Sequence, residues 1–253
     1  MGDAGHVSAE PLAKAARLQV PLWPLLVAVS LVLLIGGATA FIAAWLLSGR
    51  TRTTSYTAHG SPAGVQIRVV SGDVTIVGGS QGGVSVRRTD RSTFGHGPIE
   101  WRQRVDRRLE IASTCPKMVV GACTADYRVA VPDDVPVGVR ADHGSVRVEG
   151  YHGSASLATG DGSVTVDAFC GYTLRATSAR GDVSVVTSCS PERLELRSTS
   201  GDVSATVPPG RYRIDASTES GPALVQGLTA DPNAPWEIQA LSTSGDVTVE
   251  AGS

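Results

Sequence analysis

The first pattern along the chain is a long apolar run. From Leu25 to Leu47 there are 23 residues without a charge, which as a helix would span about 35 Å. Trp23 and Trp45 stand near its two ends, where indole rings favour the headgroup region. The run predicts a single transmembrane helix within 21–48 that contacts the lipid bilayer through residues 25–47. Ala38-Thr39-Ala40 resembles a signal-peptide cleavage site, but the apolar run continues past it and favours an anchor.

The segments on either side of this run have no sustained periodicity. Residues 1–20 are predicted to be a flexible tail, and residues 49–64, rich in Ser, Thr and Gly, a juxtamembrane linker. The folded domain is predicted to cover 65–253. Lys14 and Arg17 precede the run while Arg50 and Arg52 follow it, so the balance of positive charge does not set the direction of insertion.

After position 64 the pattern changes to apolar and polar residues in alternation. It appears first in 65–69, 74–77, 84–86 and 127–131. Alternation with a period of two is typical of strands that bury one face. No helical period of comparable length follows the anchor, so the domain is predicted to be all-β.

A short motif then repeats through the domain. Ser-Gly-Asp-Val at 71–74 returns at 200–203 and 244–247, with variants at 143–146, 161–164 and 180–183 and a degenerate copy at 220–223. From 144 onward the motif recurs about every twenty residues. Each copy is predicted to be a tight turn in which glycine supplies a positive φ. The predicted turn residues are Gly72, Gly144, Gly162, Gly181, Gly201, Gly221 and Gly245.

Alignment on these glycines predicts two strands per repeat. Apolar residues occupy the second and fourth positions after each glycine and the fifth and seventh before it, with polar residues between them. Such a unit cannot bury its own apolar face, whereas units stacked about 4.8 Å apart share one narrow core. The sequence therefore predicts a β-solenoid of stacked rungs of about 20 residues, with an interior too thin for aromatic residues. An antiparallel sandwich is the alternative.

The four cysteines test this register. Cys170 and Cys189 each lie eight residues after a repeat glycine, so stacking places their Cα atoms about 5 Å apart, within disulfide range. Cys115 and Cys123 bracket a local loop and form the second predicted pair. Two disulfides indicate an oxidising compartment and an outward-facing C-terminal domain. Buried free thiols are the alternative, and zinc is disfavoured because no CxxC spacing occurs.

Composition and charge narrow the function. The chain is 42% hydrophobic but only 5% aromatic, and its net charge is −2, too balanced for general nucleic-acid binding. One basic cluster holds Arg102, Arg104, Arg107 and Arg108. Its alternation with acidic residues predicts a solvated strand face with compensating acids rather than a nucleic-acid or lipid site.

Other motifs give no catalytic or metal site. Residues 78–82 match GxSxG, but a strand rather than a helix is predicted to follow, so a turn is favoured over a nucleophile. Asp73, Asp182, Asp202 and Asp246 are predicted to cap turns rather than bind calcium, because chain order places only two of them on neighbouring rungs. The Arg-Gly-Asp at 180–182 follows from the repeat itself. No catalytic residue, metal or cofactor is predicted.

The run DYRVAVPDDVPVGVRADHGSVRVEGYHGSASLATGDGSVT (126–165), followed by repeated Ser-Gly-Asp-Val, resembles the DUF4097 family, described as adhesins or β-strand repeat domains. The similarity extends from about Val65 to the C-terminus. It implies an anchored envelope protein with a β-solenoid-like domain and carries no chemistry of its own. The 115–123 loop and the long interval before Gly245 depart from the pattern.

These observations favour a non-catalytic binding, adhesion or scaffold module of the bacterial cell envelope. Its predicted partners are an envelope polymer or another protein, or a second copy through the terminal rung, and Arg175 beside Glu195 is a candidate pair across rungs. One alternative is a partner in envelope-stress signalling. The other is a polysaccharide-active β-helix enzyme, which needs acidic and basic residues clustered on one outer face.

Overall fold

The chain is described here by a computed structural model covering residues 22–47, 49–60, 62–93, 97–116 and 121–252. It forms two compact units, Met1–Leu47 and Ser48–Ser253. The predicted N-terminal tail, 1–20, lies outside the described residues.

The first unit contains helix α1 (Leu22–Leu47), which includes a stretch, Leu26–Ala44, long and apolar enough to cross a membrane. Its few polar side chains bond within the helix. Ser30 Oγ donates to the Leu26 carbonyl at 2.8 Å, and Thr39 Oγ1 donates to the Ile35 carbonyl at 2.9 Å. These bonds satisfy the hydroxyls without water, as a lipid environment requires.

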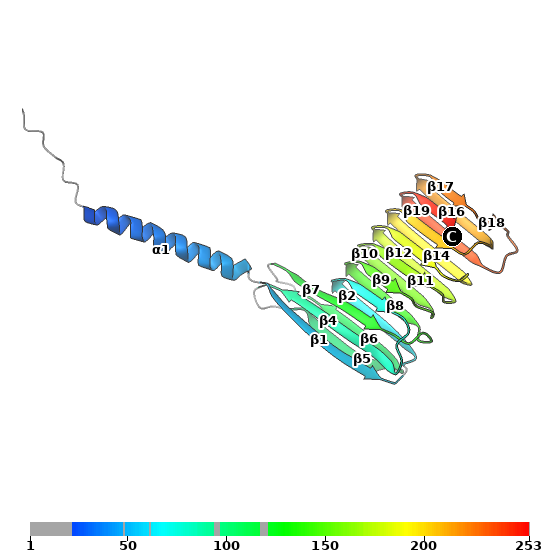
Figure 1. Cartoon of the computed structure of the whole chain (residues 1–253), viewed down its shortest axis with the longest axis horizontal. Helices are drawn as coiled ribbons and strands as arrows, with labels where there is room; N and C mark the ends of the chain where they lie inside the picture. The colour runs from blue at the N-terminus through cyan, green and yellow to red at the C-terminus, as the bar shows by residue number, and fades with distance from the viewer. Residues whose placement is uncertain (1–21, 48, 61, 94–96, 117–120, 253) are drawn as a thin grey trace, which may run out of the picture. The chain divides into compact units, whose positions relative to one another are not determined.

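The second unit consists of two sheets, named sheet A and sheet B, and Figure 1 shows their strands stacked along one axis. In spatial order, sheet A contains β1 (Arg50–His59), β4 (Gly83–Ser92), β7 (Cys123–Ala130), β3 (Val74–Val77), β9 (Val146–Glu149), β11 (Val164–Phe169), β13 (Val183–Thr187), β15 (Val203–Val207), β20 (Val247–Ala251) and β17 (Ala223–Gln226). Sheet B contains β5 (Ile99–Val105), β6 (Arg108–Thr114), β2 (Gly64–Ser71), β8 (Val137–His143), β10 (Ala155–Asp161), β12 (Thr173–Arg180), β14 (Arg193–Ser200), β19 (Glu237–Ser244), β16 (Arg211–Ser220) and β18 (Thr229–Ala230).

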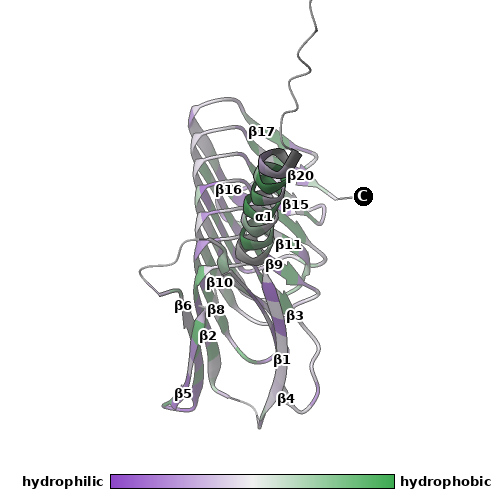
Figure 2. Ribbon diagram, turned by 90° about the vertical axis from the view of Figure 1, so that its left-hand side faces the viewer, coloured by the Kyte–Doolittle hydropathy of each residue, from purple (hydrophilic) through white to green (hydrophobic). Residues whose placement is uncertain are grey.

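A strand of sheet B, a turn and the next strand of sheet A form one rung, and rungs pair in parallel. Val164 pairs with Val183 and Val183 with Val203, so equivalent valines form one column. Viewed along the stack, sheet B lies on one side and sheet A on the other (Figure 2). The parallel register confirms the predicted β-solenoid and is incompatible with an antiparallel sandwich.

The repeat glycines stand directly over one another at the turns. All seven have φ between 136° and 147°, a region that L-residues rarely adopt. A Cβ on Gly162 would overlap the Gly144 carbonyl oxygen, and one on Gly181 would overlap the Gly162 carbonyl oxygen. Glycine is therefore required twice, by its own conformation and by the closeness of the neighbouring backbone.

A hydroxyl column satisfies the carbonyls of five of these glycines. Ser178 Oγ donates to the Gly162 carbonyl at 2.8 Å, and Ser198 Oγ donates to the Gly181 carbonyl at 2.9 Å. Ser178 is fully buried, so an unpaired carbonyl beside it would be costly. The same bond is made by Thr159, Thr218 and Ser242. The hydroxyl three residues before the glycine is thus part of the repeat.

The stacking order departs from chain order at the C-terminal end. Strands β19 and β20 lie between β14–β15 and β16–β17, so Gly245 rests on Gly201 and Gly221 rests on Gly245. The long interval before Gly245 gives the chain room to cross over the rung that precedes it. The rung β16–β17 is therefore last, and Leu224 and Val225 are half exposed there. Self-association through this terminal rung stays a prediction.

The N-terminal end contradicts the predicted linker over 49–64. Arg50–His59 forms β1, which pairs antiparallel with β4 along its whole length. Its composition is rich in Thr, whose branched side chain suits a strand as well as a linker. The rung β6–β7 also lies outside β2–β3 in the stack, although it follows β2–β3 in the chain. Strands β1, β4 and β5 add antiparallel pairs, so the predicted repeat domain 65–253 is not a solenoid throughout.

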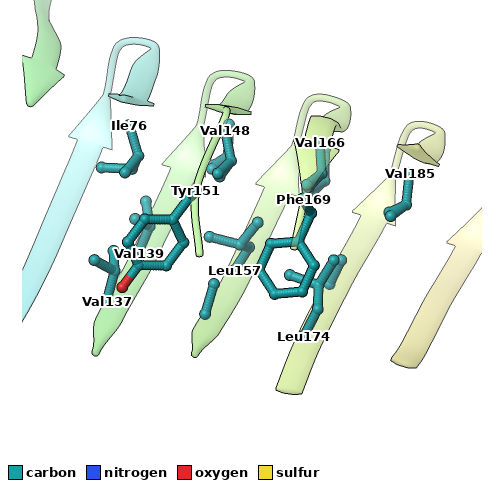
Figure 3. Close-up of a cluster of buried hydrophobic side chains, with 14 of the residues drawn as sticks. Ile76, Val137, Val139, Val148, Tyr151, Leu157, Val166, Phe169, Leu174 and Val185 are labelled. Atoms are coloured by element: carbon teal, nitrogen blue, oxygen red, sulfur yellow. The ribbon is translucent and has the colours of Figure 1, made fainter. Parts of the chain in front are cut away.

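The core is wider than the sequence suggests, and the prediction that aromatics would not fit is wrong. Tyr151 and Phe169 are fully buried and lie between the valine and leucine columns of the two sheets (Figure 3), with ring centroids 6.5 Å apart. Tyr127 and Tyr212 are also buried. Tyr151 follows β9 and Phe169 ends β11, so both rings lie at the end of a sheet A strand opposite its glycine turn.

We expect Gly162→Ala to destabilise the domain by more than about 2 kcal/mol, because an added Cβ meets backbone that cannot move without breaking a rung. Gly150→Ala is the matched control. Gly150 has φ 55°, and a Cβ added there would meet nothing within 4 Å, so the change should cost only about 1 kcal/mol. Urea unfolding compares them. Equal losses for the two variants would contradict the stacked-turn explanation.

Candidate functional site

The outer face of sheet B carries a column of polar side chains that crosses the rungs. Pairing aligns Gln103 with Glu110, Glu110 with Gln66, and Gln66 with Gly138. The column continues through Ser156, Arg175, Glu195, Gln239 and Asp215. Parallel stacking turns one outward position of the repeat into a continuous surface along the solenoid.

A recess lies at the N-terminal end of this column. It encloses about 270 Å³ beside Trp101, between Gln103 and Glu110 on one side and Gln66 and Arg68 on the other. Trp101 is 70% exposed although it is the largest residue type. Gln103 Nε2 donates to Glu110 Oε2 at 2.9 Å, which orients both groups beside the ring. An exposed indole flanked by amide and charged groups can stack on an apolar face of a ligand and bond to its polar edge.

The depression continues over the next two rungs because their outward residues are small. A Cβ on Gly138 would meet the Gln66 side chain, and Ser156 follows Gly138 in the column. A further recess of about 350 Å³ reaches Arg175 and Glu195. The groove defined by Trp101, Gln66, Gly138, Ser156 and the Arg175–Glu195 pair is named the sheet B groove. It crosses the strands from β5 to β14 and, at about 4.8 Å between neighbouring strands, is about 29 Å long.

The predicted ion pair across rungs closes the far end of the sheet B groove. Arg175 Nη2 lies 2.6 Å from Glu195 Oε2, and Arg197 Nη2 lies 3.1 Å from Glu195 Oε1. Glu195 is thereby held by two guanidinium groups that are themselves largely exposed. The arrangement keeps the guanidinium donors ordered at the surface, where they can bond to hydroxyl or carbonyl oxygens.

A second polar cluster lies between the sheets at the N-terminal end. Glu100 Oε2 accepts from Arg88 Nη1 at 2.8 Å, and its Oε1 accepts from Tyr56 Oη at 2.9 Å. Arg88 Nε also donates to Asp90 at 2.6 Å, and Tyr127 Oη lies 3.3 Å from Glu100. Arg88 and the Glu100 carboxylate are both less than a tenth exposed. The cluster joins three strands of sheet A to β5 of sheet B.

This cluster corrects the prediction of a solvated strand face over 100–108 at Glu100, whose side chain is buried, whereas Arg102 and Arg104 are exposed as predicted. Glu100, Arg102 and Arg104 point inward across the gap between the sheets, while Trp101 faces out. Arg102 packs over the Tyr56 ring, 4.1 Å from its centroid, and pairs with Glu100 at 2.9 Å. At the end of a solenoid there is no further apolar rung to cover the core, so a polar network closes it.

The two tyrosines remain protonated donors in this network. Burial, and then the nearby Glu100 charge, raise the pKa of Tyr56 and of Tyr127 well above the usual range. Their hydroxyls bond a carboxylate that already accepts from Arg88, which leaves that carboxylate satisfied. These contacts are those of a structural lock, not of an acid and base facing a substrate.

Asp73, Asp182 and Asp202 cap turns, as predicted, whereas Asp246 faces Pro222, which has no N–H to donate. Asp182 Oδ1 accepts from the Asp202 backbone N–H at 2.9 Å, and Asp202 Oδ1 accepts from that of Asp246 at 2.8 Å. Asp73 caps Ser145 at 2.8 Å in the same way. The prediction that only two of these carboxylates are neighbours is wrong, because the exchanged C-terminal order stacks Asp182, Asp202 and Asp246. Among the described residues no group of acidic, His or Cys side chains is arranged to hold a metal ion.

The remaining predicted residues lie as follows. Cys115 bonds to Cys123 and Cys170 to Cys189, with Cα separations of 6.1 and 5.0 Å. The segment 78–82 is a turn before β4, and Ser80 Oγ donates to the Gly83 carbonyl at 2.7 Å. It has no helix after it and no nucleophile elbow. Asp182 of Arg-Gly-Asp is occupied by its turn cap.

The sequence does not predict that Trp101 is exposed or that a buried polar cluster surrounds Glu100. The alternation of β5 places tryptophan opposite the charged residues, and the general rule that large apolar residues face inward gives the wrong direction. The number of charges on the opposite face of β5 could have indicated a paired polar network, because an apolar core does not accept unpaired charges.

The stacked parallel rungs define a β-solenoid protein whose N-terminal helix is a candidate membrane segment. Residues 134–250 match the family described as Toastrack DUF4097. The match covers 117 of the 253 residues and confirms the resemblance to this family over that segment. The matched segment begins at 134 rather than near 65, and the antiparallel strands β1, β4 and β5 and the rung β6–β7 precede it in the chain.

Solved structures resemble the fold at low identity. A "putative cell adhesion protein" from Clostridium sporogenes is 11% identical, with a TM-score of 0.50 over 79% of this chain and 100% of that one. A "putative adhesin" from Bacteroides fragilis is 13% identical, with a TM-score of 0.49 over 80% of this chain and 97% of that one. No curated protein matches the sequence. At these identities the likeness concerns the fold alone.

We expect Glu100→Ala to lower the free energy of unfolding by about 3 kcal/mol or more, because it leaves the buried Arg88 guanidinium without a main partner. Glu110→Ala is the matched control on the neighbouring strand. Its carboxylate bonds only Gln103 at the surface, so it should cost less than about 1 kcal/mol. Urea unfolding of both variants measures the difference, and a small effect at Glu100 would contradict the lock.

Proposed function

We propose that this protein is a non-catalytic binding module of the bacterial cell envelope, anchored by α1 and displaying its solenoid outside the cytoplasm. The observation that carries the proposal is the sheet B groove, a continuous polar surface with an exposed tryptophan at one end. The groove crosses several rungs and so suits an extended ligand better than a small one. Such a ligand is an envelope polymer with repeated polar groups.

Anchoring is supported by the helix itself. The described side chains of α1 are exposed, and a helix of this apolarity would be costly to leave in water. The hydroxyls of Ser30 and Thr39 are already satisfied inside it. The bilayer contact is therefore assigned to residues 25–47.

Placement outside the cytoplasm is supported by the cysteines. All four described cysteines form disulfides, which persist in oxidising compartments and are rare in the cytosol. The Cys170–Cys189 bond staples two consecutive repeats. The Cys115–Cys123 bond joins the end of β6 to the start of β7, within a rung that has no glycine turn motif.

Polymer binding is supported by rigidity as well as by shape. The groove residues are fixed on paired strands rather than on loops, so little side-chain and backbone freedom is lost when a ligand binds. The solved structure from Clostridium sporogenes is described as a "putative cell adhesion protein". Within the groove, carboxylates such as Glu195 are held by guanidinium groups and do not face each other as an acid and base pair would.

Cysteine labelling in intact cells tests the placement. We expect a membrane-impermeant maleimide to label the four cysteines only after treatment with a membrane-impermeant reductant, because the thiols are oxidised and outside. A cytosolic thiol protein is the control and should stay unlabelled. Labelling that needs a membrane-permeant maleimide and no reductant would place the domain in the cytosol.

Co-sedimentation with cell-wall polymer tests the groove. We expect the full chain in detergent to bind purified cell walls, and Trp101→Ala to weaken binding by about tenfold or more, as loss of an aromatic anchor does. Tyr172→Ala is the control, because Tyr172 is 72% exposed but lies outside the groove. Equal binding by all three proteins would contradict the proposed surface. Release of sugar fragments from the walls would instead favour the enzyme alternative.

A further inference from the structure

Charge is divided unevenly along the solenoid. Residues 49–131 contain twelve Arg and Lys and six Asp and Glu, a net charge of +6, whereas residues 132–253 contain eight Arg and sixteen Asp and Glu, a net charge of −8. The small net charge of the whole chain conceals this division. The basic part is the one that follows α1 in the chain.

The two parts also differ in how their arginines are paired. Every arginine beyond position 131 has a carboxylate within 4.0 Å. In the basic part, seven arginines of the described chain have no carboxylate within that distance: Arg50, Arg52, Arg68, Arg87, Arg104, Arg107 and Arg108. All seven are exposed. The compensating acids predicted for the 102–108 cluster are therefore present only for Arg102.

Most of these arginines lie at one end of the stack. Arg50 and Arg52 are on β1, the edge strand of sheet A, and Arg104 is on β5, the edge strand of sheet B. Arg107 and Arg108 follow in the β5–β6 hairpin, and Ala63 N–H bonds to the Arg107 carbonyl at 2.8 Å, just past the end of β1. The positive charge is thus spread over the whole N-terminal end face.

A recess opens in this end face between the two edge strands. It encloses about 420 Å³ and is lined by Tyr56 and Ala58 from β1, Arg102 and Arg104 from β5, and Leu109. Arg104 Nη2 donates to the His59 carbonyl at 3.3 Å, and the Arg104 side chain is exposed. Two guanidinium groups at the mouth of a partly apolar recess can bind a phosphate through several charge-assisted hydrogen bonds.

The chain connection identifies the source of phosphate. Only Ser48 and Gly49 separate the end of α1 from β1, so Arg50 stays within about 11 Å of the last helical residue. If α1 spans a bilayer, its end lies at the headgroups. We propose that the N-terminal end face, formed by β1, β5 and the β5–β6 hairpin, binds the phosphates of anionic phospholipids in the leaflet where α1 emerges. This inference rests on the proposed anchoring.

Such binding orients the domain as well as holding it. The end face is perpendicular to the stack, so its contact with lipid directs the stack and the sheet B groove away from the bilayer. The acidic part then lies far from the anionic surface, which repels it. A nucleic acid would also suit arginines, but the two-residue connection keeps Arg50 within about 11 Å of the last helical residue, which favours lipid.

Hydrogen exchange of the full chain in lipid nanodiscs tests the proposal. The discs contain phosphatidylcholine alone or phosphatidylcholine mixed with phosphatidylglycerol. We expect amides of 99–110 to exchange at least about fivefold more slowly in the mixed discs, since each arginine near an anionic surface contributes roughly that factor. High salt should remove the difference by screening.

Charge variants give the matched comparison. We expect R104Q/R107Q/R108Q to abolish the lipid-dependent slowing, and R147Q/R180Q/R211Q, which removes the same charge from paired arginines of the acidic part, to retain it. Equal exchange in both kinds of disc, with the protein inserted, would overturn the lipid site. Slowing by added heparin but not by phosphatidylglycerol would also overturn it, in favour of a soluble polyanion. Failure to insert into any disc would instead refute the anchor.

Discussion

The close contact between glycines of successive turns is the constraint on which this fold depends. At each turn the backbone of one rung lies against the carbonyl of the next, with no room for a Cβ. That contact fixes the register, and the register fixes every column: valines inside, hydroxyls on the glycine carbonyls, aspartates on the next backbone N–H. A shift of one residue would turn the apolar side chains outward. The repeat is therefore maintained by packing of backbone on backbone, not by side-chain contacts alone.

Much of the solenoid could be predicted because its signals are local and repeated. Gly162, Gly181 and Gly201 mark successive turns, and the apolar positions around them give the two strands and their inward faces. The pairing of Val164 with Val183 and the proximity of Cys170 and Cys189 follow from that alignment. Each of these inferences uses spacing within a repeat, which the sequence records directly. The surface pair between Arg175 and Glu195 follows for the same reason.

The parts that could not be predicted depend on which segments become neighbours. The sequence contains the rung at Gly245 but not its insertion between Gly201 and Gly221, because both orders give the same local pattern. The sequence of β1 indicates a linker because its partner strand, β4, lies more than twenty residues away in the chain. The sequence does not predict that Trp101 faces outward, for a related reason. Which face of β5 points inward depends on the contact of Glu100 with Arg88 and Tyr56 across the gap between the sheets. The candidate groove therefore required the structure.

The two ends of this solenoid differ in how the apolar core is covered. The N-terminal end is closed by antiparallel strands and by a carboxylate shared among an arginine and two tyrosines, which ends the apolar core without another rung. At the C-terminal end β17 is the last strand of sheet A, β18 pairs only with Arg211 and Tyr212 of β16, and the charges of β16 balance. Because each end is only one rung wide, the sides of the stack are the longer surfaces for an extended ligand. Sheet B offers such a side, because its outward column has only Gly138 and Ser156 between Gln66 and Arg175.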